Sequence, residues 1–219
     1  MADRTSHTLV LATRNHGKAR EMRALLRHLL RLPPEIAIAS LRDYPALAPI
    51  EETGATFQDN AQLKALAVAN FTGCIAIGDD SGLVVDALDG APGVHSARYA
   101  GPHARDEENN RKLLEALRAV PADRRGAHFI CVVVVALPGN VLGSFEGVCH
   151  GMIGFEPRGA NGFGYDPLFI KTDYGKTFAE LSHTVKNRIS HRTLAFEKAA
   201  TVIARYFDHL HDATEPLAS

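Results

Sequence analysis

Runs of apolar and polar residues predict alternating strands and helices in the first third of the chain. A short apolar run at residues 9–12 predicts a buried strand. From Lys18 onward, apolar residues between Met22 and Leu30 recur at three- and four-residue spacing, which predicts an amphipathic helix ended by Pro33 and Pro34. A second strand is expected over residues 36–39.

The next segment predicts a capped helix followed by an interrupted strand. Thr56 with Asp59 three residues later forms the pattern of a capping box, which predicts a helix to about Phe71. An apolar run at residues 74–78 predicts a strand. The polar sequence at residues 79–82 is expected to break it in a turn, before extended structure resumes at residues 83–85.

The second half of the chain predicts another helix, a hairpin and a closing helix. A helix is expected to open at Asp106 and to end before Pro121. Residues 129–137 and 141–149 predict two paired strands, and an amphipathic helix begins near Ser190. Its apolar stripe consists of Phe196, Ala199, Ile203, Phe207 and Leu210. Crossover helices together with a hairpin predict an α/β protein with a mixed sheet.

Composition and charge exclude several classes of protein. The 219 residues contain 24 Lys and Arg against 25 Asp and Glu, a formal net charge of -1. A protein that binds nucleic acid through phosphates normally shows a basic excess, so we expect no nucleic-acid partner. Three widely spaced cysteines indicate a reducing, cytoplasmic environment. Apolar runs are all too short for a membrane span, and we expect no membrane partner.

The turn between the first strand and the first helix is a candidate phosphate site. Residues 13–18 have the sequence TRNHGK, and a helix N-terminus offers free N–H groups and partial positive charge. Thr13 and Asn15 add donors, and Lys18 adds a full charge. The alternative is an ordinary helix cap with a solvated lysine. It is no Walker motif, because Ala12 and Ala19 stand where that motif requires Gly and Ser or Thr.

Two acids follow the predicted third strand. Asp79 and Asp80 lie where open α/β sheets place ligands, and a turn at Ser81 and Gly82 could bring both carboxylates to one cavity. Carboxylates of this kind suit Mg²⁺ shared with a substrate phosphate, and Glu51 and Glu52 could complete the set. The alternative is a solvated, Asp-rich turn.

Two further clusters suggest recognition of a planar base and an anion. Phe163 and Tyr165 lie among glycines at residues 159–166, which suggests an aromatic platform. The alternative is a tight turn whose aromatic rings merely pack. His191 and Arg192 follow the N-cap Ser190, and cations at that end of a helix suggest a bound anion or base edge.

Five segments, in this order, resemble the motifs of the inosine triphosphate pyrophosphatase family. They are LATRNHGKARE (11–21), EETGATFQDNAQLKA (51–65), DDSGLVVDALDGAPGVHSARYAG (79–101), GFGYDPLF (162–169) and ISHR (189–192). The resemblance covers about residues 9–207 and leaves the rest as a tail. It implies one domain over residues 1–219, with an elongated mixed sheet, two lobes flanked by helices, a nucleotide cleft between the lobes and a homodimer.

The resemblance also implies an activity and a set of site residues. The family hydrolyses nonstandard purine triphosphates (dITP, ITP and XTP) to monophosphate and pyrophosphate with Mg²⁺, which cleanses the nucleotide pool. Asp80 would be the catalytic proton acceptor, and Glu52 and Asp80 would hold the metal, with Asp79 as a further candidate ligand. The implied substrate-binding residues are Thr13, Arg14, Asn15, His16, Gly17, Lys18, Lys64, Ser81, Phe163, Gly164, Tyr165, Asp166, Lys186, His191 and Arg192.

Two rival functions remain open at this point. A catalytically silent nucleotide-binding module would keep the phosphate turn, although it would have no need of Glu52, Asp79 and Asp80. A related pyrophosphatase acting on modified pyrimidine triphosphates would share the whole site. How a purine site rejects GTP, which also carries a 6-keto group, does not follow from the sequence.

Overall fold

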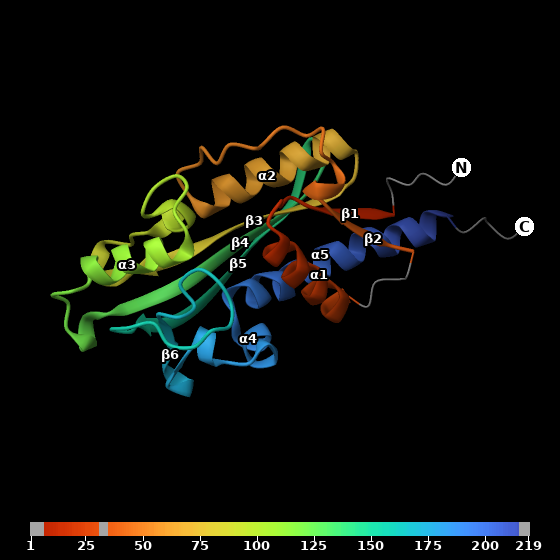
Figure 1. Ribbon diagram of the computed structural model, residues 1–219. Coiled ribbons are helices and arrows are strands. Elements are labelled where there is room, and N and C mark those ends of the chain that lie inside the picture. The colour runs from red at the N-terminus through yellow and green to blue at the C-terminus, as the bar shows by residue number, and fades with distance from the viewer. Residues whose placement is uncertain (1–6, 31–34, 215–219) are drawn as a thin grey trace, which may run out of the picture. The chain divides into compact units, whose positions relative to one another are not determined.

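The protein is a mixed α/β structure whose strands form one seven-stranded sheet (Figure 1). The computed structural model describes residues 7–30 and 35–214, with side chains up to His209. The strands follow the order β2-β1-β3-β4-β5-β6-β7. They are β1 (Thr8–Leu11), β2 (Ala37–Ser40), β3 (Ile75–Val85), β4 (Gly126–Leu137), β5 (Asn140–Ile153), β6 (Phe169–Lys171) and β7 (Lys176–Thr177). This confirms the predicted fold class.

Five α-helices and six short 3-10 helices complete the described part of the chain. The α-helices are α1 (His16–Leu30), α2 (Phe57–Thr72), α3 (Asp106–Ala116), α4 (His183–Ile189) and α5 (His191–Thr214). The 3-10 helices are η1 (Leu41–Asp43), η2 (Asp86–Leu88), η3 (Gly93–Arg98), η4 (Ala122–Arg124), η5 (Thr172–Tyr174) and η6 (Phe178–Glu180). None of the helices described is both long and apolar enough to cross a membrane.

The chain forms two compact units, and β3, β4 and β5 each contribute residues to both. The first unit contains the residues up to Asp80, Val132–Glu146 and the residues from Ala195. Its strand β1 pairs in parallel with β2 and β3 through Leu9, which faces Ile38 on one side and Ile75 on the other. Parallel neighbours require crossover connections, which α1 and α2 provide.

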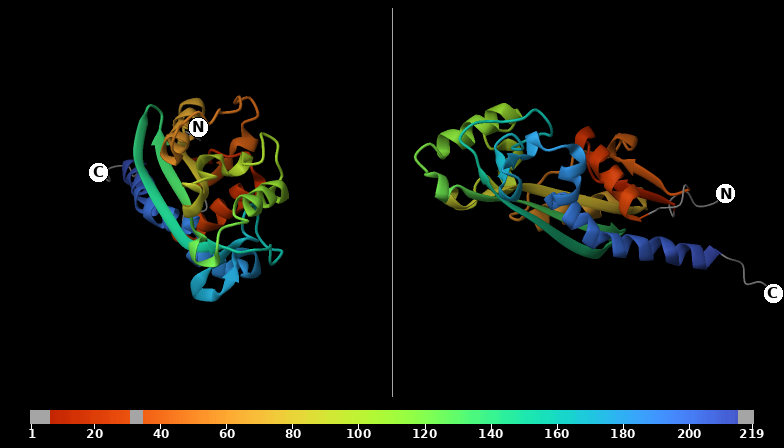
Figure 2. Two further views of the ribbon diagram at one scale, coloured as in Figure 1. Left: turned by 90° about the vertical axis from the view of Figure 1, so that its left-hand side faces the viewer. Right: turned by 90° about the horizontal axis from the view of Figure 1, so that it is seen from below.

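Helices α1, α2 and α5 bury their apolar faces in the first unit. Helix α2 begins at the predicted capping box, because Thr56 accepts the Asp59 N–H and Asp59 accepts the Thr56 N–H. Helix α5 buries Phe196, Ala199, Ile203 and Phe207, as its sequence predicts, and Leu210 lies outside the described side chains. Its Lys198 donates to the Glu146 carbonyl of β5, beside which the helix lies in Figure 2. The predicted end of α1 at Pro33 and Pro34 lies outside the described residues.

The second unit contains Ser81–Cys131 and Gly147–Leu194. Strands β5, β6 and β7 pair in antiparallel fashion here, which makes the sheet mixed. The core of this unit includes Phe129, Phe169 and Phe178, whose rings contact one another. All three cysteines of the chain are buried and free, as expected for a chain without disulfides.

The structure contradicts one prediction about secondary structure. Strand β3 runs without interruption from Ile75 to Val85, so the expected break at residues 79–82 is wrong. Gly78 shows why the strand can stay regular against α2: a Cβ atom there would lie 2.2 Å from the Ala61 carbonyl oxygen and 2.7 Å from the Ala65 nitrogen. Helix and strand therefore approach more closely than any residue with a side chain would allow.

Candidate active site

The turn between β1 and α1 forms a capped helix N-terminus. Asn15 caps the helix, because its Oδ1 accepts the Lys18 N–H at 3.0 Å, and the Thr13 hydroxyl oxygen accepts the Asn15 N–H at 3.2 Å. The first turn of a helix leaves several N–H groups without intrahelical partners. Asn15 accepts the N–H of Lys18, and the N–H groups of His16 and Gly17 are left available to an anion. This turn can therefore cap the helix and bind a phosphate group at the same time.

The side chains of this turn differ in their surroundings. Thr13 is buried, whereas Asn15 and His16 are exposed. The Arg14 guanidinium donates to the carbonyl of Leu47, in the loop after η1. Lys18 is partly exposed, and its Nζ lies 3.3 Å from Oδ2 of the buried Asp79. One cation thus stands at the helix N-terminus, where phosphate oxygens would bind.

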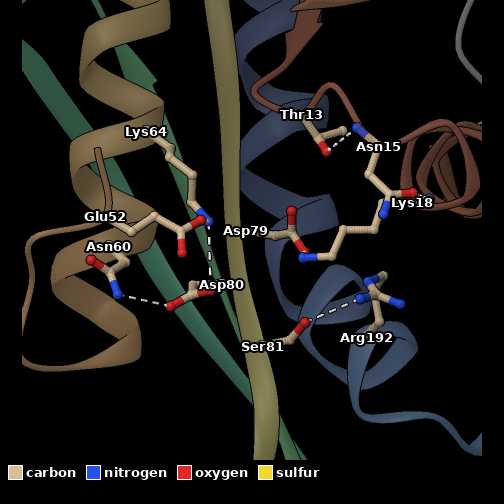
Figure 3. A network of polar contacts seen from close by, with 10 residues as sticks. All are labelled: Thr13, Asn15, Lys18, Glu52, Asn60, Lys64, Asp79, Asp80, Ser81 and Arg192. Atoms are coloured by element: carbon tan, nitrogen blue, oxygen red, sulfur yellow. Dashed lines mark hydrogen bonds and ion pairs between the residues drawn. The ribbon is translucent and has the colours of Figure 1, made fainter. Parts of the chain in front are cut away.

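Asp79 and Asp80 lie on opposite faces of β3 (Figure 3). The expectation that a turn would bring both carboxylates into one cavity is therefore wrong, because successive side chains on a regular strand alternate in direction. Asp79 faces α1 and pairs with Lys18, whereas Asp80 faces α2 and pairs with Lys64 at 3.5 Å. The nearest lysine is therefore a different one for each aspartate, although the Asp79 charge also acts on Lys64.

Asp80 belongs to a buried polar cluster at the N-terminal half of α2. Asn60 donates from Nδ2 to Asp80 Oδ2 at 3.1 Å, and its Oδ1 accepts the Gly54 N–H at 2.8 Å. Lys64 Nζ lies 3.0 Å from Glu52 Oε1 and 3.5 Å from Asp80 Oδ1. Asn60 and Lys64 are four residues apart, so they lie on one face of the helix. The two side chains hold the carboxylates of Glu52 and Asp80 near one ammonium group.

Burial and charge shift the pKa values of this cluster in ways that suit proton transfer. Burial raises the pKa of the Asp80 carboxyl above its ordinary value, with the Lys64 charge opposing the shift and the Glu52 charge adding to it. Burial lowers the pKa of Lys64, but the carboxylates of Asp79, Asp80 and Glu52 outweigh it and raise the pKa overall. Lys64 therefore stays a cation, whereas Asp80 is a stronger base than an exposed aspartate.

The chemistry of this cluster fits a hard divalent cation. Glu52 and Asp80 present carboxylate oxygens to a common positive group, the Lys64 ammonium. Within the described residues, no group of three or more His, Cys, Asp or Glu side chains is placed to hold a metal. Two carboxylates are few for a protein-only site, but they suit Mg²⁺, which usually keeps several waters and shares substrate phosphate oxygens.

A second cluster lies at the glycine-rich loop of the second unit. The Phe163 ring is 43% exposed, and its backbone N–H donates to Asp166 Oδ2 at 2.9 Å. Lys186 forms an ion pair with Asp166 and lies over the Phe163 ring, 5.0 Å from its centroid. The Arg192 guanidinium lies 5.8 Å from the same centroid. An exposed aromatic face beside two buried cations can stack on a planar base and donate to its polar edge.

Tyr165 does not belong to this aromatic surface, so its predicted role in a platform is wrong. The side chain is buried in the core of the second unit, and its hydroxyl donates to the Ser96 carbonyl at 2.9 Å. Burial raises the pKa of this phenol. The loop turns inward here: residues 161–163 are exposed and Tyr165 and Asp166 are buried, so Phe163 faces outward whereas Tyr165 holds the loop on the core. Gly164 contributes its backbone, and Asp166 is buried beneath Phe163.

The start of α5 places His191 and Arg192 as the sequence suggests. Ser190 caps the helix, since its Oγ accepts the Thr193 N–H at 3.2 Å. The His191 ring stacks on Phe129, with centroids 4.8 Å apart. Arg192 is 2% exposed and donates from Nη2 to the Ser81 hydroxyl at 3.1 Å. Ser81 follows Asp80 directly in the chain, so β3 carries contacts to both clusters.

Sequence reasoning missed three residues that support these clusters: Asn60, Asp106 and Asn110. Asn60 connects Asp80 to the Gly54 backbone. Asp106 and Asn110, from α3, contact the loop that carries Phe163. Asn60 could have been found from the sequence. It lies four residues before Lys64, so the two polar side chains share one face of α2, and that face is buried.

A helix N-terminus with nearby lysines and carboxylates on a mixed α/β fold is typical of proteins that bind phosphate groups. Comparison with known proteins identifies the family. The chain belongs to the Ham1 family, whose model matches residues 9–202. This confirms the resemblance found in the sequence.

Relatives and solved structures agree with this assignment. The chain is 49% identical over 201 residues to a dITP/XTP pyrophosphatase of Desulforamulus reducens, covering 92% of this chain and 98% of that protein. It is 51% identical over 184 residues to a dITP/XTP pyrophosphatase of Geobacter sulfurreducens, covering 84% and 90%. The structure of a HAM1 protein from Coxiella burnetii matches with a TM-score of 0.81 and 42% identity, covering 90% of this chain and 98% of that one.

Proposed function

We propose that this protein hydrolyses nonstandard purine nucleoside triphosphates (dITP, ITP and XTP) to the monophosphate and pyrophosphate. The observation that carries the proposal is the pair of consecutive acids on β3: Asp79 pairs with Lys18 on the side of α1, and Asp80 pairs with Lys64 on the side of α2 (Figure 3). This arrangement supplies two cations for a polyphosphate and a buried carboxylate for a water molecule. The family assignment and the names of the relatives support it.

In this proposal the triphosphate is bound by residues of the first unit. The N–H groups of His16 and Gly17 and the Lys18 ammonium bind phosphate oxygens at the N-terminus of α1. Lys64 offers a second positive charge, and its raised pKa keeps it protonated. Negative charge grows on the leaving pyrophosphate during hydrolysis, and fixed cations stabilise that charge without having to reorganise.

Asp80 is the proposed general base. Its carboxylate accepts the proton of the attacking water, and without metal its burial raises its pKa above the ordinary value. Asn60 and Lys64 hold the carboxylate in one orientation. Glu52 and Asp80 would hold Mg²⁺, which when bound would neutralise phosphate charge and polarise the scissile anhydride.

Base selectivity follows from the donors around Phe163. Lys186 and Arg192 carry hydrogen-bond donors and no acceptors, and both are nearly buried. Hypoxanthine and xanthine present a keto oxygen at position 6, which accepts from such donors. The 6-amino group of adenine would instead leave the donors unpaired, and sites of this kind reject analogues by about 10⁴-fold. The proposed base site therefore disfavours ATP.

We also propose that the protein is a homodimer that works in the cytoplasm. Three buried free thiols suit a reducing compartment. Burial raises the pKa of the Cys149 thiol, which makes it less reactive still. Light scattering after gel filtration tests the dimer: a mass of one chain would contradict it.

A panel of triphosphates tests the proposed substrate class. Equal concentrations of XTP, dITP, ITP, dGTP, dATP and dUTP are incubated with the protein and Mg²⁺, and pyrophosphate is quantified. We expect XTP, dITP and ITP to be hydrolysed well above dATP and dUTP, which lack a 6-keto purine, and the dGTP rate shows whether the 2-amino group is also rejected. Preference for dUTP would favour a pyrimidine pyrophosphatase, and tight binding of dITP without hydrolysis would favour a silent nucleotide-binding module.

A further inference from the structure

Helix α3 holds one residue of the glycine-rich loop by both of its backbone polar groups. Asp106, the first residue of α3, accepts the Gly164 N–H at 2.6 Å. Asn110, one turn later on the same face, donates from Nδ2 to the Gly164 carbonyl at 3.0 Å. Gly164 has a φ of 64°, a left-handed conformation that favours glycine. These two contacts are called the α3 clamp below.

The α3 clamp acts on the residue next to Phe163. The Phe163 N–H is itself bound by Asp166, so the backbone of the exposed ring is fixed on both sides. Close packing does not provide this restraint on the side of α3. A cavity of about 540 Å³ lies there, and its lining includes Asn110, Leu114, Gly162, Phe163 and Gly164. On the side of the cavity, the hydrogen bonds from Asp106 and Asn110, and not close packing of side chains, therefore fix the loop at Gly164.

The state of Asn110 points to the same conclusion. The residue is 8% exposed, and its Oδ1 is buried without a hydrogen-bond partner in the described part of the chain. A buried amide oxygen without a partner costs stability, which a leucine of similar size would avoid. Unlike a leucine, the asparagine can donate the hydrogen bond from Nδ2 to the Gly164 carbonyl.

We propose that Asp106 and Asn110 are positioning residues that hold Phe163 in place for the purine base. The inference rests on the proposed function, in which Phe163 stacks on the base. A ring fixed before binding loses little conformational freedom when the base arrives, so more of the stacking energy contributes to affinity. Neither residue touches the phosphates in this proposal, so the α3 clamp affects the base-containing part of the ligand alone.

Four variants of the full-length protein test the α3 clamp. Asp106→Ala and Asn110→Leu each remove one bond to Gly164. Asp106→Asn removes the negative charge at the helix N-terminus but keeps an acceptor oxygen. Glu107→Ala is the matched control, because Glu107 lines the same cavity on the same helix and has no side-chain bond to the loop in the described structure. Binding of IMP and of pyrophosphate is measured by calorimetry.

We expect Asp106→Ala and Asn110→Leu to weaken IMP binding about tenfold, the lower range for losing one base–aromatic stack. Pyrophosphate binding should change by less than about twofold, as for an independent site. The KM for dITP should rise more than kcat falls. Asp106→Asn and Glu107→Ala should bind both ligands as the wild type does.

Hydrogen exchange over residues 160–166 reports on the α3 clamp without any ligand. It should accelerate in Asp106→Ala and Asn110→Leu and stay unchanged in Glu107→Ala. Unchanged exchange, unchanged IMP affinity, equal weakening of IMP and pyrophosphate, or an Asp106→Asn variant as weak as Asp106→Ala would each overturn the inference. Failure of the wild type to hydrolyse any purine triphosphate would instead overturn the proposed function, and with it the role of the clamp toward a base.

Discussion

Replacement of Asp80 with asparagine removes one charge from the α2-facing side of β3 and leaves the size of the side chain unchanged. Asp80 is 5% exposed and contacts Asn60 and Lys64. An asparagine oxygen can still accept the Asn60 hydrogen bond, but an amide neither accepts a proton from water nor binds a divalent cation well. We expect kcat for dITP to fall by ~10² or more, the usual range for a lost general base.

The stability of the same variant separates catalysis from folding. At 3.5 Å, the attraction between Asp80 and Lys64 is about 5 kcal/mol at an effective dielectric constant of 20. Desolvation of a buried ion costs several kcal/mol as well. Burial, with the Glu52 charge adding to it, raises the pKa of Asp80 in spite of the attraction to Lys64. Lys64 keeps Glu52 at 3.0 Å and is not left alone. We therefore expect the melting temperature without metal to be unchanged or higher, by at most about 3 °C.

Both quantities are measured on one preparation, by pyrophosphate release and by calorimetry. The matched control is Asp123→Asn, which makes the same change at an exposed position of η4 and should leave turnover and melting temperature as they are. Normal dITP turnover by Asp80→Asn would refute the catalytic role. A large fall in melting temperature would refute the reasoning about burial.

Three further substitutions test separate parts of the structure. Lys18→Ala should lower kcat/KM for dITP and dATP by the same factor, because Lys18 stands at a phosphate site; a changed ratio of the two rates would contradict this. Phe163→Leu should weaken IMP binding about tenfold by loss of stacking, with pyrophosphate binding intact, and calorimetry would contradict it if both ligands were lost equally. Gly78→Ala should destabilise the protein by about 1–3 kcal/mol, because its Cβ overlaps the α2 backbone; an unchanged melting temperature would show that strand and helix can separate without cost.

Features encoded by neighbouring residues were predictable from the sequence. The capping box at Thr56, the hairpin between β4 and β5 and the cap at Ser190 each depend on residues within a few positions of one another. The apolar stripe of α5 follows from helical periodicity alone. The candidate lysines and carboxylates were also found, since charged residues stand out beside apolar runs.

Features that depend on distant partners were not predictable. Asp79, Asp80 and Ser81 have the composition of a turn, but lysines from α1 and α2 pair with the two acids, and β3 continues through them. Tyr165 lies only two residues after Phe163 in the same glycine-rich segment. Its hydrogen bond to the distant Ser96 carbonyl shows that it faces the core, and no local pattern predicts that bond. The contacts of Asp106 and Asn110 span more than 50 residues, so no local pattern reveals them.

Identification of the first product tests the central claim most directly. The wild-type protein is incubated with dITP or XTP and Mg²⁺, and pyrophosphate and orthophosphate are quantified separately, with and without EDTA. We expect pyrophosphate and the monophosphate in equal amounts, no orthophosphate, and loss of the reaction in EDTA. Orthophosphate as the primary product, or a rate that EDTA leaves unchanged, would contradict the proposed chemistry of Asp80, Glu52 and the two lysines.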